Sequence, residues 1–385
     1  MKKLFFVALF ILNSSVYAID WSRENFCPTG DVERVLKIMS TMTIEEKVGQ
    51  VIMADLDFVK PSDLKKYPLG GILNGGNTSP NGKLRSTPQE WRALAQDFHN
   101  NSISRGGANI PVLWGTDAVH GHSNVFGATI YPHNIGLGAT QNIDLLREIG
   151  SAVAEEVLAT GLFWTFAPTV TVPQDYRWGR TYEGYSESPE LVNLLGQAFI
   201  EGLQGTGEDF LSDKKIIGTA KHFLGDGGTF LGRDQGDTKT TEEALKRIHG
   251  TSYFGALDSC IQTVMASFNS WNGSKLHGND YLLTEVLKNR MNFNGFVVGD
   301  WNGHGQVPGC SNASCAQSFN AGVDMFMVPE NWKDLYRNTL RQVKSGEISK
   351  ERLDDAVKRI LLVKERLGMF DNKQPRNTPF SKVGT

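Results

Sequence analysis

The chain alternates short apolar runs with longer stretches in which hydrophobic residues recur every three to four positions. The short runs are typical of buried strands, and the longer stretches have the period of amphipathic helices. The apolar runs are residues 51–53, 71–73, 110–114, 163–167, 216–220, 263–267, 296–299 and 325–328. Helical patterns fill most of the gaps, for example at residues 88–104, 144–160, 189–203, 242–257 and 281–291. This alternation predicts an α/β fold with a parallel sheet, and eight repeats favour a closed (β/α)8 TIM-type barrel over an open sheet.

The N-terminal residues 1–18 do not belong to this repeat. Two lysines precede an apolar run at residues 4–12, and Val16-Tyr17-Ala18 forms a small-residue cleavage site. This is the pattern of a secretory signal peptide, and its apolar run is too short to span a bilayer. No later segment is apolar enough to span one either. We therefore expect an exported protein with no membrane association after signal cleavage, located in the periplasm or secreted, as in Gram-negative bacteria.

The C-terminal residues 371–385 are polar and contain two prolines, which predicts a linker-like tail after a barrel domain at residues 19–370. The composition, with 40% hydrophobic and 21% charged residues, is that of an ordinary globular protein. The net charge of −3 gives no reason to expect nucleic acid or an anionic membrane as a partner.

The four cysteines are candidates for oxidation in an exported protein. Cys310 and Cys315 are five positions apart, in the loop after the seventh predicted strand, where a disulfide would stiffen one wall of a site. Cys27 and Cys260 are interpreted as free thiols. The Cys and His spacings resemble no zinc site, so no metal and no other cofactor is expected.

The seventh predicted strand ends in Asp300 and Trp301. A carboxylate directly after a buried strand is not a packing residue, and this is the end of a barrel strand at which catalytic groups lie. Trp301 offers a flat apolar face of the kind on which sugar rings stack. We interpret Asp300 as a catalytic nucleophile. The alternative is a solvated aspartate in a loop, with Trp301 as a core residue.

Other predicted strands also end in polar clusters. The third leads into WGTDAVHG with Asp117, the fourth into RWGR with Arg180, and the fifth into KHFLGDGGT with Lys221 and His222. In a barrel these ends converge on one face and form a polyol-binding site. Each motif alone has an ordinary alternative: a helix cap for Asp117, a surface ion pair with Glu183 for Arg180, and a buried structural pair for Lys221-His222.

Five motifs, WGTDAVHGH, RWGRTYEGYSE, KHFLGDGGT, SFNSWNG and GFVVGDW, resemble in this order the N-terminal barrel of glycoside hydrolase family 3. The resemblance covers residues 19–370 and is closest to exo-acting β-glucosidases and β-glucan glucohydrolases. It implies that Asp300 is the nucleophile and Trp301 an aromatic wall. The groups implied to hold the terminal sugar are Asp117, Arg180, Lys221 and His222. Phe268 stands where some members have a tyrosine, and Gln235 where some plant members have a glutamate.

The resemblance implies retaining hydrolysis of a β-glucoside or β-glucan oligosaccharide. Asp300 attacks the anomeric carbon, a second carboxyl about 5–5.5 Å away protonates the leaving oxygen, and water hydrolyses the covalent intermediate. Lys221 and Arg180 are expected to keep the pKa of Asp300 low.

The second carboxyl is not identified in the sequence. In the β-glucosidase branch of the family it comes from an α/β domain that follows the barrel, and this sequence stops about where the linker to that domain would begin. A single-barrel branch carries a His-Asp dyad in one of its loops. That loop here reads Gly232-Arg233-Asp234-Gln235 and contains no such dyad. Asp226 and Asp234 are the nearby carboxylates. We therefore expect a fragment, or half of a split enzyme, that lacks its C-terminal α/β domain.

Two alternative functions remain from the sequence. One is a β-xylosidase of the same family, since the motifs do not determine the group at C5 of the sugar. The other is a sugar-binding pseudoenzyme without its acid/base. A periplasmic transport-type binding protein is disfavoured, because that class has two hinged open-sheet domains rather than eight strand-helix units.

Overall fold

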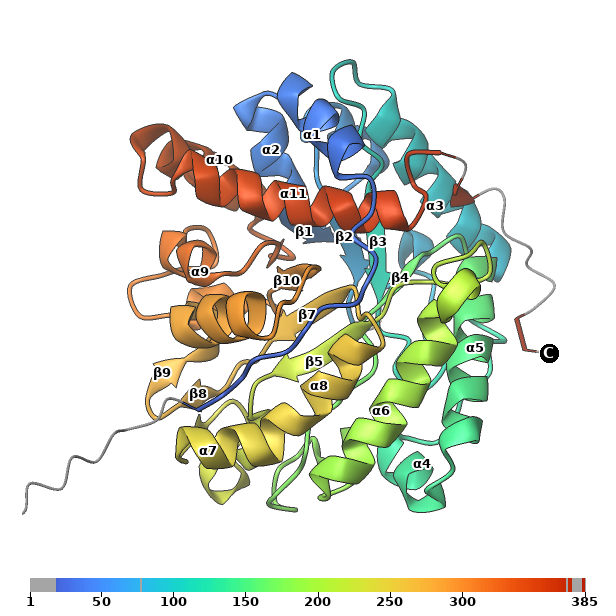
Figure 1. The fold of residues 1–385 in the computed structure, drawn as a ribbon. Helices are drawn as coiled ribbons and strands as arrows, with labels where there is room; N and C mark the ends of the chain where they lie inside the picture. Colours follow the sequence, from blue (N-terminus) through green and yellow to red (C-terminus); the bar gives the residue numbers. More distant parts are fainter. Residues whose placement is uncertain (1–18, 77, 372, 376–382, 385) are drawn as a thin grey trace, which may run out of the picture.

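The computed structural model describes residues 19–371 except residue 77, together with residues 373–375 and 383–384 (Figure 1). The predicted signal peptide and most of the predicted tail therefore lie outside the described residues. None of the helices within the described ranges is long and apolar enough to cross a membrane.

Eight parallel strands form the centre of the molecule. They are β1 (Ile52–Asp55), β2 (Gly71–Asn74), β3 (Leu113–Thr116), β4 (Trp164–Thr165), β5 (Thr219–Phe223), β7 (Thr263–Ala266), β10 (Phe296–Val298) and β11 (Phe326–Met327). Their order is β11-β1-β2-β3-β4 in one sheet and β10-β7-β5 in another. Parallel bridges from Trp164 to Ile217 and from Val298 to Met325 join the two sheets into a ring. The predicted (β/α)8 barrel is confirmed, and each predicted apolar run overlaps one of these strands.

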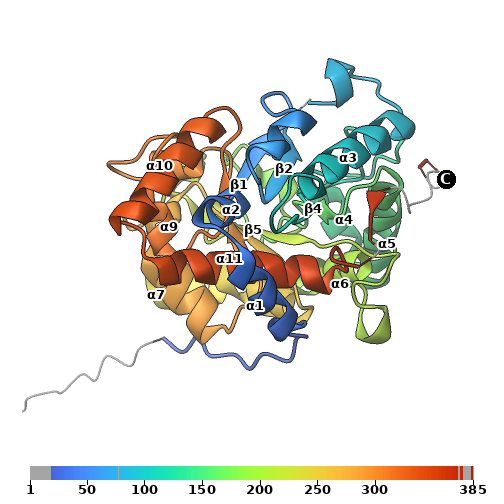
Figure 2. The same ribbon diagram turned by 90° about the horizontal axis from the view of Figure 1, so that it is seen from above.

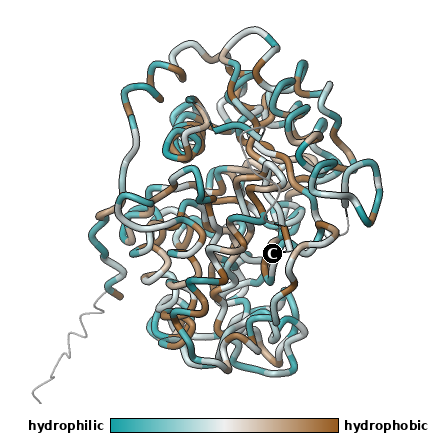
Figure 3. Tube along the Cα trace, turned by 90° about the vertical axis from the view of Figure 1, so that its right-hand side faces the viewer, coloured by the Kyte–Doolittle hydropathy of each residue, from teal (hydrophilic) through white to brown (hydrophobic). Residues whose placement is uncertain are grey.

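Helices surround the strands on the outside (Figures 1 and 2). The α-helices are α1 (Val32–Thr41), α2 (Ile44–Gln50), α3 (Pro88–Ile103), α4 (Asn134–Thr140), α5 (Ile143–Ala159), α6 (Pro189–Gln204), α7 (Glu242–Ala244), α8 (Thr251–Asp258), α9 (Ala316–Ala321), α10 (Trp332–Ser345) and α11 (Lys350–Arg366). Two further segments, η7 (Leu245–Gly250) and η9 (Tyr281–Arg290), are π-helical. Hydrophobic positions concentrate toward the centre of the molecule and polar ones toward its surface (Figure 3).

Large side chains fill the barrel interior. The ring of Trp164 lies 4.9 Å from that of Phe166 and 5.5 Å from that of Phe296, centroid to centroid. Its indole N–H donates to the hydroxyls of Thr219 and Thr263, at 2.8 and 3.1 Å. The barrel is therefore a packed core rather than a pore, and ligands are confined to its ends.

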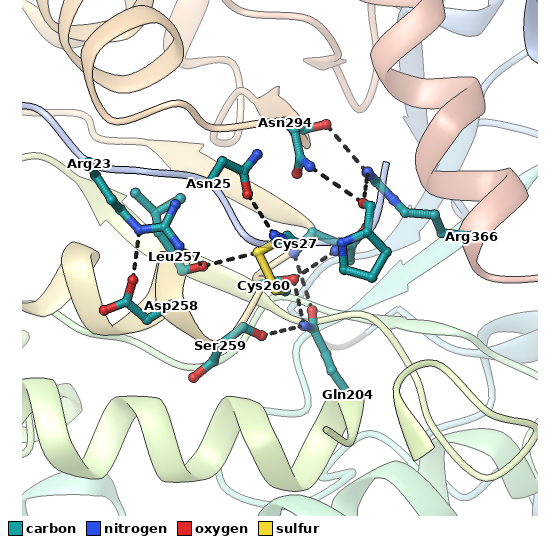
Figure 4. The surroundings of a disulfide bond; sticks show 12 residues. Arg23, Asn25, Cys27, Gln204, Leu257, Asp258, Ser259, Cys260, Asn294 and Arg366 are labelled. Atoms are coloured by element: carbon teal, nitrogen blue, oxygen red, sulfur yellow. Dashed lines mark hydrogen bonds and ion pairs between the residues drawn. A yellow bond between two sulfur atoms is a disulfide. The ribbon is translucent and has the colours of Figure 1, made fainter. Parts of the chain in front are cut away.

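A disulfide between Cys27 and Cys260 fastens the N-terminal segment to the end of α8 (Figure 4). Arg23 adds an ion pair to Asp258 at 2.7 Å. The interpretation of Cys27 and Cys260 as free thiols was wrong, because 233 positions separate them in the sequence and only the fold brings their Cα atoms to 5.4 Å. A second disulfide joins Cys310 to Cys315 in the loop between β10 and α9.

A small sheet that the sequence did not predict lies on the loops after β5 and β7. Its strands are β6 (Asp237–Thr238), β8 (Ser270–Trp271) and β9 (Ser274–Lys275), in the order β6-β8-β9. Each has two residues, too few to give a periodic pattern in the sequence. The sheet ties together two of the loops that carry predicted site residues.

Candidate active site

Asp300 follows β10 directly and is 9% exposed. Its Oδ1 accepts the backbone N–H of Trp301 at 2.6 Å. Its backbone N–H donates to Nε2 of buried His277 at 2.9 Å, and Nδ1 of His277 bonds the carbonyl of Ser267 at 2.9 Å. The other carboxylate oxygen, Oδ2, has no hydrogen-bond partner among the described residues and lies 3.7 Å from Nε2 of His222. One oxygen of Asp300 is thus held by a hydrogen bond, and the other is buried without a hydrogen-bond partner among the described residues.

Lys221 and His222 are consecutive residues of β5, and both are buried. Nζ of Lys221 donates to Oδ1 of Asp117, which follows β3, at 3.1 Å. The side chain of Asp117 is 39% exposed and that of Lys221 is 6% exposed. The ammonium group is therefore held from one side by a carboxylate that still faces solvent.

Arg180, in the loop after β4, forms a two-pronged ion pair with Glu183. Its Nε and Nη2 donate to the two carboxylate oxygens at 2.7 and 3.0 Å, and Nη2 also contacts Nε2 of His222 at 3.0 Å. Burial raises the pKa of Glu183, but the Arg180 guanidinium outweighs it and lowers that pKa to about 2. The ion pair considered as a surface alternative exists, but it is partly buried and forms part of the site.

A pocket of about 300 Å³ opens beside these groups. Its walls are Asp117, Val119, His120, His133, Asn134, Thr169, Arg180, Tyr182, Glu183 and Lys221. The imidazoles of His120 and His133 pack with their centroids 4.1 Å apart. This volume is at the small end of the range for ligand sites and suits a ligand such as one sugar ring.

Three predicted site residues, Asp300, His222 and Trp301, do not line this pocket. Nε2 of His222 lies 3.7 Å from Oδ2 of Asp300 and 3.0 Å from Nη2 of Arg180, and Arg180 lines the pocket. The Trp301 side chain is partly exposed and packs on the backbone of Gly75, where an added Cβ would lie 2.1 Å from the indole ring.

The wall formed by His120, His133, Tyr182 and Glu183 was not predicted from the sequence. His120 and Glu183 lie within the motifs quoted above, close in sequence to Asp117 and Arg180. This proximity could have indicated that they belong to the same site. His133 lies 13 positions after His120 and is brought to it only by the fold.

The pKa of Asp300 is raised from 3.8 to about 6. Burial is the main cause; Arg180, the Trp301 N–H and Lys221 act in the opposite direction but do not offset it. The expectation of a low pKa was wrong, because burial of the Asp300 carboxylate raises its pKa by more than Arg180 and Lys221 lower it.

The two carboxylates considered as substitutes for the acid/base have other partners. Asp226 is buried behind His222, and its Oδ2 lies 2.8 Å from Nδ1 of that ring, whereas Asp300 approaches the other ring nitrogen. Asp234 is exposed and accepts the indole N–H of Trp178 at 3.1 Å.

The positions of Gln235 and Phe268 are joined through Lys275 of β9. Lys275 Nζ donates to the Phe268 carbonyl at 2.7 Å and to the Gln306 side chain at 2.9 Å, and Gln306 donates to Gln235 at 2.8 Å. This cluster links the loops after β5, β7 and β10. Phe268 also contacts His277, the residue that holds the backbone of Asp300, with ring centroids 6.0 Å apart.

Carboxylates, a guanidinium, an ammonium and imidazoles thus meet at the strand ends of a (β/α)8 barrel, the face at which enzymes of this fold carry their catalytic groups. Residues 43–363 match the family model "Glycosyl hydrolase family 3 N terminal domain". This match spans well over half of the chain, and the chain belongs to that family.

Relatives agree with this assignment. The chain is 30% identical to the lysosomal beta glucosidase of Dictyostelium discoideum, over 88% of this chain and 44% of that protein. It is 28% identical to the periplasmic beta-glucosidase of Salmonella typhimurium, over 91% of this chain and 43% of that protein. The crystal structure of an exo-1,3/1,4-beta-glucanase from a Pseudoalteromonas species is 47% identical, with a TM-score of 0.93, over 96% of this chain and 47% of that one. The chain therefore spans less than half the length of these relatives.

Proposed function

We propose that this chain carries the nucleophile and the sugar-binding groups of an exo-acting retaining β-glucosidase or β-glucan glucohydrolase. The reaction is hydrolysis of an O-glycosyl bond, with release of glucose from the non-reducing end of a β-glucoside or β-glucan oligosaccharide. One observation carries the proposal: Oδ2 of Asp300 is buried, has no partner among the described residues, and lies 3.7 Å from His222, whose ring contacts Arg180 in the wall of a pocket lined by charged groups. The names of the relatives support the substrate class.

In the proposed reaction, Oδ2 of Asp300 attacks the anomeric carbon as the bond to the leaving oxygen breaks. An acid gives that oxygen a proton, which leaves a covalent glucosyl-Asp300 ester. Water, deprotonated by the same group, then displaces Asp300 and releases glucose. Lys221 and Arg180 donate hydrogen bonds to sugar hydroxyls, Asp117 accepts from them, and Trp301 covers an apolar face of the substrate.

The proposed sugar has free hydroxyl groups. Asp117 and Arg180 are charged partners suited to hydroxyls rather than to an N-acetyl group. The residues of the pocket do not determine the group at C5, so a β-xyloside is the alternative substrate.

The acid/base is proposed to come from outside the described residues, from a second α/β domain. The carboxylates described above near the site have other partners: Asp117 pairs with Lys221, Glu183 with Arg180 and Asp226 with His222, and Asp234 accepts from Trp178. Exposed apolar side chains are also frequent on the loops that follow the strands, a distribution suited to a covering domain. These side chains are Phe58, Leu84, Phe126, Ile130, Tyr176, Tyr182, Phe230, Leu231 and Trp301.

Export to the periplasm or medium is part of the proposal. Residues 1–18 have the composition of a signal peptide. Two disulfides support an oxidising compartment.

Hydrolysis of 2,4-dinitrophenyl β-glucoside, 4-nitrophenyl β-glucoside and cellobiose by the 385-residue protein tests the proposal, with the matching xylosides in parallel. The dinitrophenyl leaving group barely needs protonation, so we expect it to be cleaved while cellobiose is not. Cleavage of cellobiose would place the acid within this chain. Faster cleavage of the xylosides would favour the β-xylosidase. Glucose binding without any cleavage would make the chain a sugar-binding pseudoenzyme.

A further inference from the structure

His222 is held between two partners that determine which ring nitrogen carries the proton. Nδ1 lies 2.8 Å from Oδ2 of Asp226, and Nε2 lies 3.0 Å from Nη2 of Arg180. A guanidinium has only N–H groups, so Arg180 donates and Nε2 accepts with its lone pair. The proton of the neutral ring is therefore on Nδ1, from which it is donated to Asp226. Burial, and then the charges of Arg180 and Lys221, hold the pKa of His222 well below its ordinary value, so the ring remains neutral.

Asp226 is buried and does not line the pocket. Its Oδ1 accepts the Thr171 hydroxyl at 2.7 Å and the Gly227 backbone N–H at 3.0 Å, and its Oδ2 accepts from His222. A buried carboxylate is costly even when it is hydrogen-bonded. Asp226 touches no reacting atom in the reaction proposed above, so an effect of Asp226 on the rate passes through His222.

The tautomer of His222 determines what Asp300 faces. Oδ2 of Asp300 lies 3.7 Å from Nε2, and it is the oxygen without a partner among the described residues. With the proton on Nδ1, Nε2 cannot donate to that oxygen. With the proton on Nε2, the ring would point an N–H at the Arg180 guanidinium, and Asp300 Oδ2 would be the acceptor beside it. A donated hydrogen bond would stabilise the carboxylate and make it a weaker nucleophile.

We propose that Asp226 is a positioning residue that fixes the Nδ1–H tautomer of His222 and thereby keeps the attacking oxygen of Asp300 free of a proton donor. This inference rests on the proposed role of Asp300 as the nucleophile. Asp226 does not touch the sugar in this scheme.

The charged groups around the pair are consistent with this role. His222 is faced by Arg180, Lys221 and Glu183 as well as by Asp300. Asp226 is faced by His249 of η7 and Tyr253 of α8. Burial lowers the pKa of His249 to about 4 and raises the pKa of Tyr253 well above its ordinary value, so both are neutral near pH 7.

The variant Asp226→Asn tests the inference. The Gly227 N–H can only donate, so the amide oxygen of the asparagine must take the Oδ1 position, and its NH2 group then faces Nδ1 of His222. An acceptor at Nδ1 requires the ring proton on Nε2, where this N–H opposes the Arg180 guanidinium and has Oδ2 of Asp300 as its acceptor. Thr171→Val is the matched control, because it removes a hydrogen bond from the same carboxylate, together with the longer hydroxyl contacts to the Lys221 carbonyl and the His222 backbone N–H, and leaves both ring nitrogens of His222 with their partners.

Two measurements are made on the 385-residue protein and both variants, after circular dichroism has shown that they are folded. The first is the 15N chemical shifts of the His222 ring, assigned with His222→Gln, which report the tautomer. The second is the rate at which 2,4-dinitrophenyl 2-deoxy-2-fluoro-β-glucoside labels Asp300, as a function of pH. We expect Asp226→Asn to switch the tautomer and to slow labelling by roughly 10²-fold or more. The pH below which labelling falls off should also be lower in this variant than in the wild type. Thr171→Val should keep the tautomer and the position of the limb.

The inference is overturned if Asp226→Asn keeps the Nδ1–H tautomer, or if it labels Asp300 at the wild-type rate after the switch. An equal loss of rate in Thr171→Val with an unchanged tautomer would also overturn it. Failure of the wild type to label at Asp300 would instead refute the proposed function, whichever tautomer the spectra report.

Discussion

Replacing Asp300 with asparagine should abolish activity and yet stabilise the protein at neutral pH. The folded-state pKa of Asp300 is about 6, against an ordinary value of 3.8. This difference corresponds to a cost of about 3 kcal/mol for keeping the buried carboxylate ionised. An asparagine removes the charge, retains the acceptor for the Trp301 N–H, and places an NH2 group near the lone pair of His222 Nε2.

The pH dependence of this gain has a definite sign. Below about pH 4 the carboxyl is protonated in both folded and unfolded chains, so variant and wild type should be equally stable. Between about pH 4 and 6 only the unfolded chain ionises, and the wild type loses stability as the pH rises. Above about pH 6 both states are ionised and the full difference is present, about 4 °C in melting temperature for a domain of this size.

Differential scanning calorimetry of wild type and Asp300→Asn between about pH 4 and 8 measures this effect. Asp144→Asn serves as the control, because the side chain of Asp144 is 88% exposed and its ion pair with Arg147 contributes little. A variant that is no more stable than the wild type at neutral pH, or a gain that persists at the acid end of this range, would refute the account of the Asp300 environment.

Three further outcomes are expected. The kcat/KM for 2,4-dinitrophenyl β-glucoside should fall as the pH drops, with a midpoint near the Asp300 pKa of about 6 as this carboxylate is protonated; a midpoint close to the ordinary value of 3.8 would contradict the raised pKa. Cys27→Ser should lower the free energy of unfolding in urea by about 2–5 kcal/mol, and wild type with reductant should approach the variant; equal stability would show that the disulfide contributes nothing. Gly75→Ala should displace the indole of Trp301, only 2.1 Å from the added Cβ, and lower kcat/KM by roughly 10- to 100-fold; unchanged kinetics would remove Trp301 from the substrate site.

The architecture was predictable because barrel strands are buried on both faces and therefore appear as continuous apolar runs. The strand limits were less accurate where functional residues belong to the strand. The apolar run at 216–220 predicted a strand ending before Lys221, whereas β5 continues through Lys221 and His222 to Phe223. A pattern based on hydrophobicity ends where polar side chains begin, although the backbone pairing continues.

The site was predictable in composition but not in electrostatics. The motifs predicted Asp300, Arg180 and Lys221 as site residues, and a barrel places their strand ends on one face. The pKa of Asp300 depends on how deeply the fold buries its carboxylate, and that is a property of the three-dimensional arrangement. Burial raises this pKa by more than the two cations lower it.

Contacts between distant segments were the least predictable. Cys27 and Cys260 are joined only because the N-terminal segment reaches α8. The small β6-β8-β9 sheet likewise depends on two loops meeting, and its strands are too short to give a pattern.

Trapping the covalent intermediate shows whether Asp300 is the nucleophile. The protein is incubated with 2,4-dinitrophenyl 2-deoxy-2-fluoro-β-glucoside, digested, and analysed by mass spectrometry. We expect a fluoroglucosyl group on the peptide that contains Asp300, and none in Asp300→Asn. A label on another carboxylate, or hydrolysis of the unfluorinated substrate by Asp300→Asn at the wild-type rate, would contradict it.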